Sequence, residues 1–74
     1  PSERRVLIAM SEDGEGPSSS SEVARRMQMK PTSLGPYRAN LIAKGLLYAP
    51  EHGLLAYTVP GMASYVHRNR DDLI

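Results

Sequence analysis

The residue types that most often carry out catalysis or bind metals are scattered along this chain. The serines of 18–21 form a run, but the spacing places no base beside them, so nucleophilic catalysis is not expected. His52 and His67 lie far apart in a chain without cysteine, and no carboxylates cluster around them, so no metal site is expected. The stretch DGEGPS has glycines but lacks the lysine of a G-x-x-x-x-G-K-S/T phosphate loop. We therefore expect a segment that is not an enzyme and that holds no cofactor of its own.

The residues that could bind a partner gather on one helix, which the sequence predicts to end at Gly45. At about 100° per residue, its apolar arc consists of Leu34, Tyr37, Leu41, Ile42 and Gly45. The opposite arc consists of Gly35, Pro36, Ala39, Asn40, Ala43 and Lys44. Reading DNA bases requires Arg, Lys, Asn or Gln, and only Asn40 and Lys44 qualify on this arc. Because Ala39 and Ala43 are small, DNA backbone or a protein surface can approach closely, so phosphate or protein contacts are favoured over base reading.

The start of this helix offers further candidate contacts. Pro36 is tolerable only in the first turn, which places the helix start near Thr32 or Ser33. Either residue can cap the helix, and the outward amides there could seat a phosphate; the alternative is a cap without a ligand. Lys30 is another candidate contact. It is expected in the turn before the helix, because Pro31 disfavours helix at that position.

Arg38 lies in the middle of the apolar arc, and two roles remain open for it. Its stem could pack inward while the guanidinium reaches Glu12 or Glu22. Alternatively, it could anchor a partner surface or a phosphate. The arginine pairs 4–5 and 25–26 allow similar alternatives, as phosphate contacts or as a solvated face.

Composition narrows the class of protein. The chain of 74 residues suffices for one small domain, which buries only about 60% of the surface of its unfolded chain. The absence of cysteine and of a signal peptide favours a cytoplasmic location, and no apolar run approaches the roughly 20 residues of a membrane span. Nine basic and eight acidic residues give a net charge of +1, below the basic excess usual for a nucleic-acid binder, although one basic face remains compatible with it. Because the sequence begins with Pro1, we expect part of a longer protein.

Helix signals dominate the first half of the chain. The apolar spacing of 3–10 predicts a first helix, and the glycines, proline, serines and acids of 11–21 predict a polar loop. Ser19 and Glu22 match a capping box at the start of a second helix. A short strand at 17–19 could precede that helix. The residues expected to point inward from these two helices are Val6, Leu7, Met10, Val23, Ala24 and Met27.

The second half predicts a hairpin and a fourth helix. Two apolar runs flank the turn PEHG within 46–59, as in a β-hairpin. His52 at its tip could donate to a DNA backbone, although Glu51 beside it repels phosphate. Pro60 is expected at the start of the fourth helix, and the tail 70–74 is expected to fray. The inward residues of this helix would be Met62, Tyr65 and Val66.

The order helix, helix, helix, strand, strand, helix indicates a fold class. Two helices joined by a short turn and followed by a hairpin match a winged helix-turn-helix. We therefore expect residues 1–74 to form a single α+β domain of this type. Its core should bring together Val23, Leu34, Leu41 and Leu46.

The region from Ser18 to Arg68 resembles the C-terminal winged-helix domain of bacterial, in particular actinobacterial, AAA-type ATPases. These ATP-binding proteins are distantly similar to origin-recognition ATPases. The resemblance rests on the stretches EVARRM, SLGPYRANLIAKGLLYAP, GLLAYTVPGM and SYVHR. It implies that ATP binds an upstream domain and not this segment.

Two functions remain open on these grounds. The first is binding of duplex DNA, mainly through phosphates and weakly in isolation, in the service of the upstream ATPase domain. The second is a protein-interaction module that docks on the ATPase domain or on a neighbouring subunit. The fold and the resemblance favour DNA, whereas the smooth outer arc of the third helix favours protein.

Overall fold

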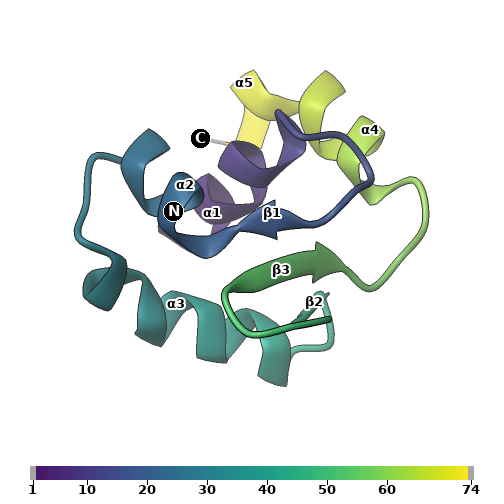
Figure 1. Ribbon diagram of the computed structural model, residues 1–74. Helices are drawn as coiled ribbons and strands as arrows, with labels where there is room; N and C mark the ends of the chain where they lie inside the picture. The colour runs from purple at the N-terminus through teal and green to yellow at the C-terminus, as the bar shows by residue number, and fades with distance from the viewer. Residues whose placement is uncertain (1, 74) are drawn as a thin grey trace.

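Three helices in the first part of the chain pack against one another (Figure 1). The structure, a computed structural model that describes residues 2–73, has α1 at Ser2–Ser11, α2 at Ser20–Arg26 and α3 at Pro31–Ala43. α1 contacts both α2 and α3, and α2 contacts α3. The apolar spacing predicts these three helices. None of the helices within residues 2–73 has the length and apolar character needed to cross a bilayer.

A small antiparallel sheet packs beside the helices. Its strands are β1 (Ser18–Ser19), β2 (Leu47–Tyr48) and β3 (Leu54–Tyr57). β3 is central, in the order β1-β3-β2, and pairs antiparallel with both neighbours. The expected hairpin and the expected short strand before the second helix are confirmed. The chain therefore has a mixed α+β fold with a three-stranded sheet.

The fourth helix, α4 (Met62–Arg68), starts later than expected. The prediction of Pro60 at the helix start was wrong, because Gly61 takes the N-cap position with a φ of 83°. Glycine adopts this left-handed conformation without steric cost. The buried face of α4 also differs from the prediction, since Tyr65 is 52% exposed whereas Ala63 is 2% exposed.

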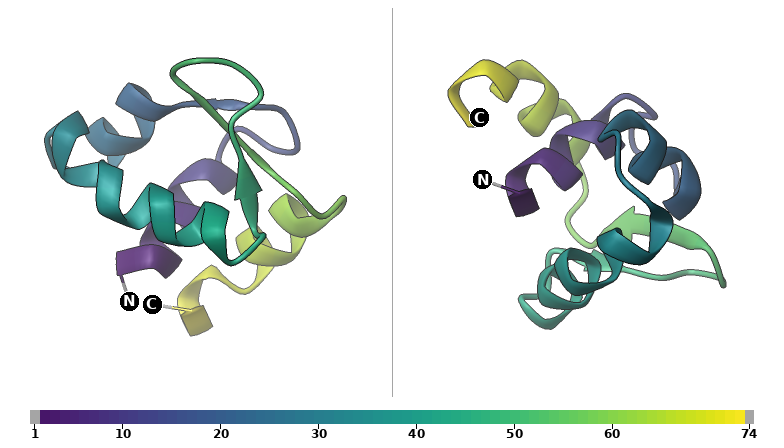
Figure 2. Two further views of the ribbon diagram at one scale, coloured as in Figure 1. Left: turned by 90° about the horizontal axis from the view of Figure 1, so that it is seen from below. Right: turned by 90° about the vertical axis from the view of Figure 1, so that its left-hand side faces the viewer.

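The tail of the chain is helical where fraying was expected. α5 spans Arg70–Leu73 and contacts both α1 and α4. Leu73 packs against the core while remaining partly exposed. Figure 2 shows the start of α1 and α5 side by side. Ile74, the last residue of the predicted tail, lies outside the described residues.

One buried cluster joins the helices to the sheet. Three of its expected members, Val23, Leu34 and Leu41, are at most 1% exposed. The full cluster consists of Val6, Ala9, Met10, Val23, Ala24, Leu34, Leu41, Leu47, Leu55, Tyr57, Ala63 and Val66. Other residues expected to point inward pack against it but stay partly exposed: Leu7, Met27, Tyr37, Ile42, Leu46 and Met62.

The start of α3 corrects the predicted cap. Lys30 occupies the N-cap position without a side-chain hydrogen bond, and Pro31 opens the helix. Proline suits this position because its φ is already helical and its missing amide has no helical partner there. Thr32 and Ser33 therefore lie inside the first turn, and the Ser33 amide donates to the Lys30 carbonyl at 2.9 Å. That amide is not free to bind a phosphate.

Pro36 lies in the second turn of α3, one turn later than predicted. Proline at this depth removes one backbone hydrogen bond. The preceding residue is Gly35, which lacks the Cβ atom that would clash with a following proline ring. This glycine explains how α3 continues through Pro36 to Ala43.

Candidate nucleic-acid interface

The predicted site residues form an extended surface and not a compact pocket. Two groups lie along α3 and at its end, and all of their members are exposed: Lys30, Thr32 and Ser33, then Ala39, Asn40, Ala43 and Lys44. His52 is exposed in the turn between β2 and β3. At about 1.5 Å per residue, Lys30 and Lys44 lie roughly 21 Å apart along the helix, the rise of about six base pairs.

The polar residues at the C-terminal end of α3 are occupied by a carboxylate from α1. Lys44 Nζ donates to Glu3 Oε1 at 2.6 Å, and Asn40 Nδ2 donates to Glu3 Oε2 at 3.3 Å. The hydrogen bond from Lys44, supported by the charge of Lys44 and by the Asn40 amide, holds the pKa of the Glu3 carboxyl below its ordinary value of 4.5. Glu3 is therefore ionised at neutral pH.

This contact changes the interpretation of the outer arc of α3. Asn40 and Lys44 were predicted to reach outward freely, and the structure instead joins both to α1. Glu3 is the residue that sequence reasoning missed. Its partner Lys44 is 41 positions away in sequence, and no local spacing connects the two.

The arginines of α2 are also paired within the chain. Arg26 forms a bidentate ion pair with Asp13, with Nη1–Oδ2 at 2.8 Å and Nη2–Oδ1 at 2.9 Å, and it donates to the Ala9 carbonyl at 2.9 Å. Arg25 pairs with Glu22 on the same helix. These contacts favour a structural role for Arg26 over a free phosphate-binding role, whereas the Arg25 side chain remains 71% exposed.

Arg38 does not form the expected ion pair. Within residues 2–73 it has no salt bridge, and Glu22, one of its two expected partners, is paired with Arg25. Arg38 is nevertheless half-buried on α3. The predicted partner acids were therefore wrong.

The distribution of charge along the sequence separates α3 from the rest of the chain. Between Glu22 and Glu51 there is no acidic residue, while five of the nine basic residues fall in this stretch: Arg25, Arg26, Lys30, Arg38 and Lys44. The stretch covers most of α2, the whole of α3 and β2. The Glu3 carboxylate is thus brought by α1 onto a helix that has none of its own.

The hairpin turn is anchored beside the start of α2. The Ser20 amide donates to the Gly53 carbonyl at 2.8 Å, and β1 pairs with β3 directly before it. His52, next to Gly53, therefore lies near the start of α2.

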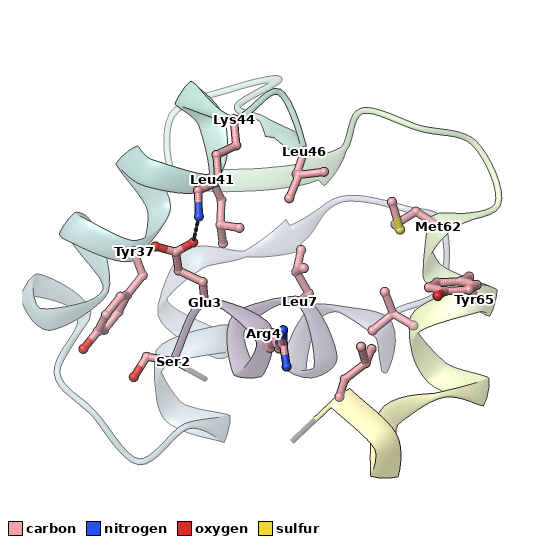
Figure 3. Close-up of a pocket in the computed structure, with 12 residues that line it drawn as sticks. Ser2, Glu3, Arg4, Leu7, Tyr37, Leu41, Lys44, Leu46, Met62 and Tyr65 are labelled. Atoms are coloured by element: carbon pink, nitrogen blue, oxygen red, sulfur yellow. Dashed lines mark hydrogen bonds and ion pairs between the residues drawn. The ribbon is translucent and has the colours of Figure 1, made fainter.

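An open groove of about 620 Å³ runs between α1, α3 and α4 (Figure 3). Its walls are mainly apolar, with Leu7 from α1, Leu41 from α3 and Met62 from α4. The Glu3–Lys44 pair forms part of one wall, as the dashed line in Figure 3 shows. The groove does not include the outward residues Ala39 and Ala43.

A protein-family model described as "Domain of unknown function (DUF8462)" matches residues 1–66. The chain belongs to this family. The match extends from the region of α1 into α4, so all of the predicted site residues and Glu3 lie within it. Comparisons with curated proteins and with solved structures gave no match.

Proposed function

We propose that this chain is a winged helix-turn-helix module that binds duplex DNA mainly through the phosphate backbone. α2 and α3 would form the helix-turn-helix, and the β2–β3 hairpin would be the wing. On the resemblance stated from the sequence, the module would serve an AAA-type ATPase domain of a longer protein, and that domain would bind ATP.

The observation that carries this proposal is that α3 and its flanks contain no acidic residue of their own, although Glu3 of α1 reaches the C-terminal end of α3. All of the charged side chains in the stretch between Glu22 and Glu51, which contains α3, are basic. The outward side chains of Ala39 and Ala43 are exposed and small, so a duplex backbone could approach α3 closely. Lys30 is exposed at the far end of the helix and has no salt bridge within residues 2–73.

The same surface predicts weak and poorly sequence-specific binding. Base readout requires long polar side chains, and the outer face of α3 offers few of them. Phosphate contacts without base readout give dissociation constants of roughly 10⁻⁴–10⁻⁶ M at physiological salt. We expect the isolated chain to fall in this range.

A second function is favoured by a specific observation. The outward face of α3 is smooth and uncharged around Ala39 and Ala43, and Glu3 neutralises Lys44 beside it. Such a surface also suits docking on the ATPase domain or on a neighbouring subunit, because small residues permit close packing. Bulk would then matter more than charge on this face.

Fluorescence anisotropy with a duplex of about 20 base pairs tests the DNA proposal. Titrations at several salt concentrations should give a linear fall of log K with log salt, as counterion release requires. Lys44→Ala should weaken binding and reduce the salt slope by about one. The matched control is Arg68→Ala, which removes an exposed cation from α4 and should leave the slope unchanged.

Two further variants separate DNA from protein as the partner. Ala39→Glu should abolish DNA binding because it places a carboxylate against phosphate, whereas Ser64→Glu on α4 is the control for added charge. Ala43→Leu should disrupt docking on the purified ATPase module as strongly as Ala39→Glu if protein is the partner, and Lys44→Ala should then do little. If none of these variants alters either interaction, α3 is not the binding surface and the hairpin turn around His52 should be tested next.

A further inference from the structure

The contact between α1 and α3 has the form of an occupied anion-binding site. Asn40 and Lys44 are four residues apart, so their side chains neighbour each other on one face of a helix. Each donates to a different oxygen of the same carboxylate, at 3.3 Å and 2.6 Å. The two donors thus hold an oxyanion between them, and Glu3 supplies that oxyanion from a distant part of the chain.

We propose that Asn40 and Lys44 form a seat for an external oxyanion, that Glu3 fills this seat in the free protein, and that a backbone phosphate of bound DNA displaces Glu3. The identity of the displacing ligand rests on the proposed function. The seat itself rests on the geometry of the three side chains. Glu3 would then set how tightly the chain holds DNA.

The chemistry of the two donors suits a phosphate as well as a carboxylate. A lysine ammonium binds phosphate as a point charge, and an asparagine amide is a common donor to phosphate oxygens. No acidic residue of the stretch between Glu22 and Glu51 competes for these donors. Glu3 is the carboxylate that the structure places on them.

The exposure of the pair explains why Glu3 can leave. The side chain of Lys44 is 60% exposed and that of Glu3 is 27% exposed, so water can replace the contact when it opens. Exposed ion pairs of this kind contribute little to stability. Competition from Glu3 should therefore weaken ligand binding only about two- to fivefold. One additional contact to a phosphate is enough to offset this loss of affinity.

The first experiment measures DNA affinity by anisotropy in a mutant cycle. Glu3→Gln keeps the size of the side chain and removes the competing charge, so it should tighten DNA binding about two- to fivefold. Glu12→Gln is the matched control, since Glu12 is exposed beyond the other end of α1 and its carboxylate forms no salt bridge within residues 2–73. In the Lys44→Ala background, Glu3→Gln should give no gain beyond that of Glu12→Gln.

The proposal is overturned if Glu3→Gln and Glu12→Gln tighten binding equally, because Glu3 would then act only through general repulsion of DNA. It is also overturned if the gain from Glu3→Gln persists when Lys44 is alanine. A circular dichroism melt of each variant establishes that the fold is retained, so a loss of binding cannot be assigned to unfolding.

A second experiment tests the seat without DNA. Inorganic phosphate, titrated to millimolar concentration, should shift the Asn40 side-chain amide signals in an NMR spectrum of Glu3→Gln more than in the unmodified chain. If these shifts appear and no variant binds DNA, the seat is supported and the proposed function fails. If they are absent in Glu3→Gln, the seat is refuted whether or not DNA binds elsewhere on the chain.

Discussion

Three acidic side chains of this protein are each held by a basic residue. Glu3 pairs with Lys44, Asp13 with Arg26, and Glu22 with Arg25. Two of these pairs join separate helices or loops, and one lies within a helix. These acids neutralise Arg25, Arg26 and Lys44 locally. The basic residues without a salt bridge within residues 2–73 therefore decide which face attracts an anion.

The Asp13–Arg26 pair predicts a pH dependence of stability. The hydrogen bonds from Arg26 hold the pKa of the Asp13 carboxyl below its ordinary value of 3.8. A carboxyl whose pKa is lowered on folding contributes stability above its unfolded pKa, and loses it as the pH falls through the folded pKa. Asp13→Asn should lower the free energy of unfolding by about 1 kcal/mol at pH 7, and this difference should disappear well below pH 3.8.

Urea unfolding at neutral and at strongly acidic pH measures this difference. Glu51→Gln removes an exposed carboxylate of the hairpin turn and serves as the control, with little expected change at either pH. An Asp13→Asn deficit that is equally large in acid would show that the ion pair is not its source.

Partners distant in sequence could not be predicted at the residue scale. The acids expected for Arg38 were Glu12 and Glu22, and the outer arc of α3 was expected to carry free polar groups. Both expectations came from the position of residues on a single helix. The side chain of Glu3 reaches α3 only because of how α1 crosses it, and this crossing is a property of the packed core.

At the scale of elements, the local signals in the sequence were informative. Ser19 caps α2, accepting a hydrogen bond from the Glu22 amide at 3.4 Å. Gly45 follows α3 with a φ of 79°. Its amide donates to Ile42 at 2.9 Å, and the Leu46 amide donates to Leu41 at 3.0 Å. This pattern is a Schellman motif, which satisfies the last carbonyls of the helix.

Gly45→Ala should therefore destabilise the protein through its backbone. An L-residue with a side chain requires about 1–2 kcal/mol to adopt a left-handed conformation. Apart from the two chain neighbours, no residue lies within 4 Å of the added Cβ to contribute a clash. Gly16→Ala is the control, since Gly16 is equally open and is not among the glycines with positive φ. Thermal unfolding of both variants compares them, and equal melting temperatures would contradict the assigned cap.

The boundaries of α3 and α4 were less predictable than their existence. Pro31 opens α3 although Thr32 and Ser33 are better capping residues, because proline is compatible with the first helical position. Pro36 was expected to lie in the first turn and so to fix the helix start. Gly35 before it lacks the Cβ atom that would clash with the proline ring, so the helix can begin earlier. In each case the neighbouring residue decided the outcome.

At the scale of the whole molecule, the side chains on the buried face of α3 hold this helix in place. Leu41 is 1% exposed within the central cluster, and Leu41→Ala should cost about 2–5 kcal/mol of unfolding free energy. Val59→Ala is the control, since Val59 is 47% exposed and its truncation should change stability by less than about 0.5 kcal/mol. An unchanged urea midpoint for Leu41→Ala would show that α3 is oriented differently in solution.

The order and type of the elements followed from the sequence because each rests on contacts within a few residues. The position of Tyr65 did not, since helical spacing placed it inward while the structure leaves it 52% exposed beside the groove. α4 contacts α1, and its buried side chains are Val66, as expected, and the smaller Ala63, which was not expected. Which stripe of a short helix is buried depends on the helix it meets, and that information is not local.

The contact between α1 and α5 bears on how this fold can be joined to other proteins. Because the first and last helices touch (Figure 2), a host chain could enter and leave the fold at nearly one place. Domains with adjacent ends are well suited to insertion into a surface loop of another protein and to circular permutation. A chain entering ahead of α1 would pass directly beside Glu3, so the way in which the fold is tethered could itself alter how readily that carboxylate moves.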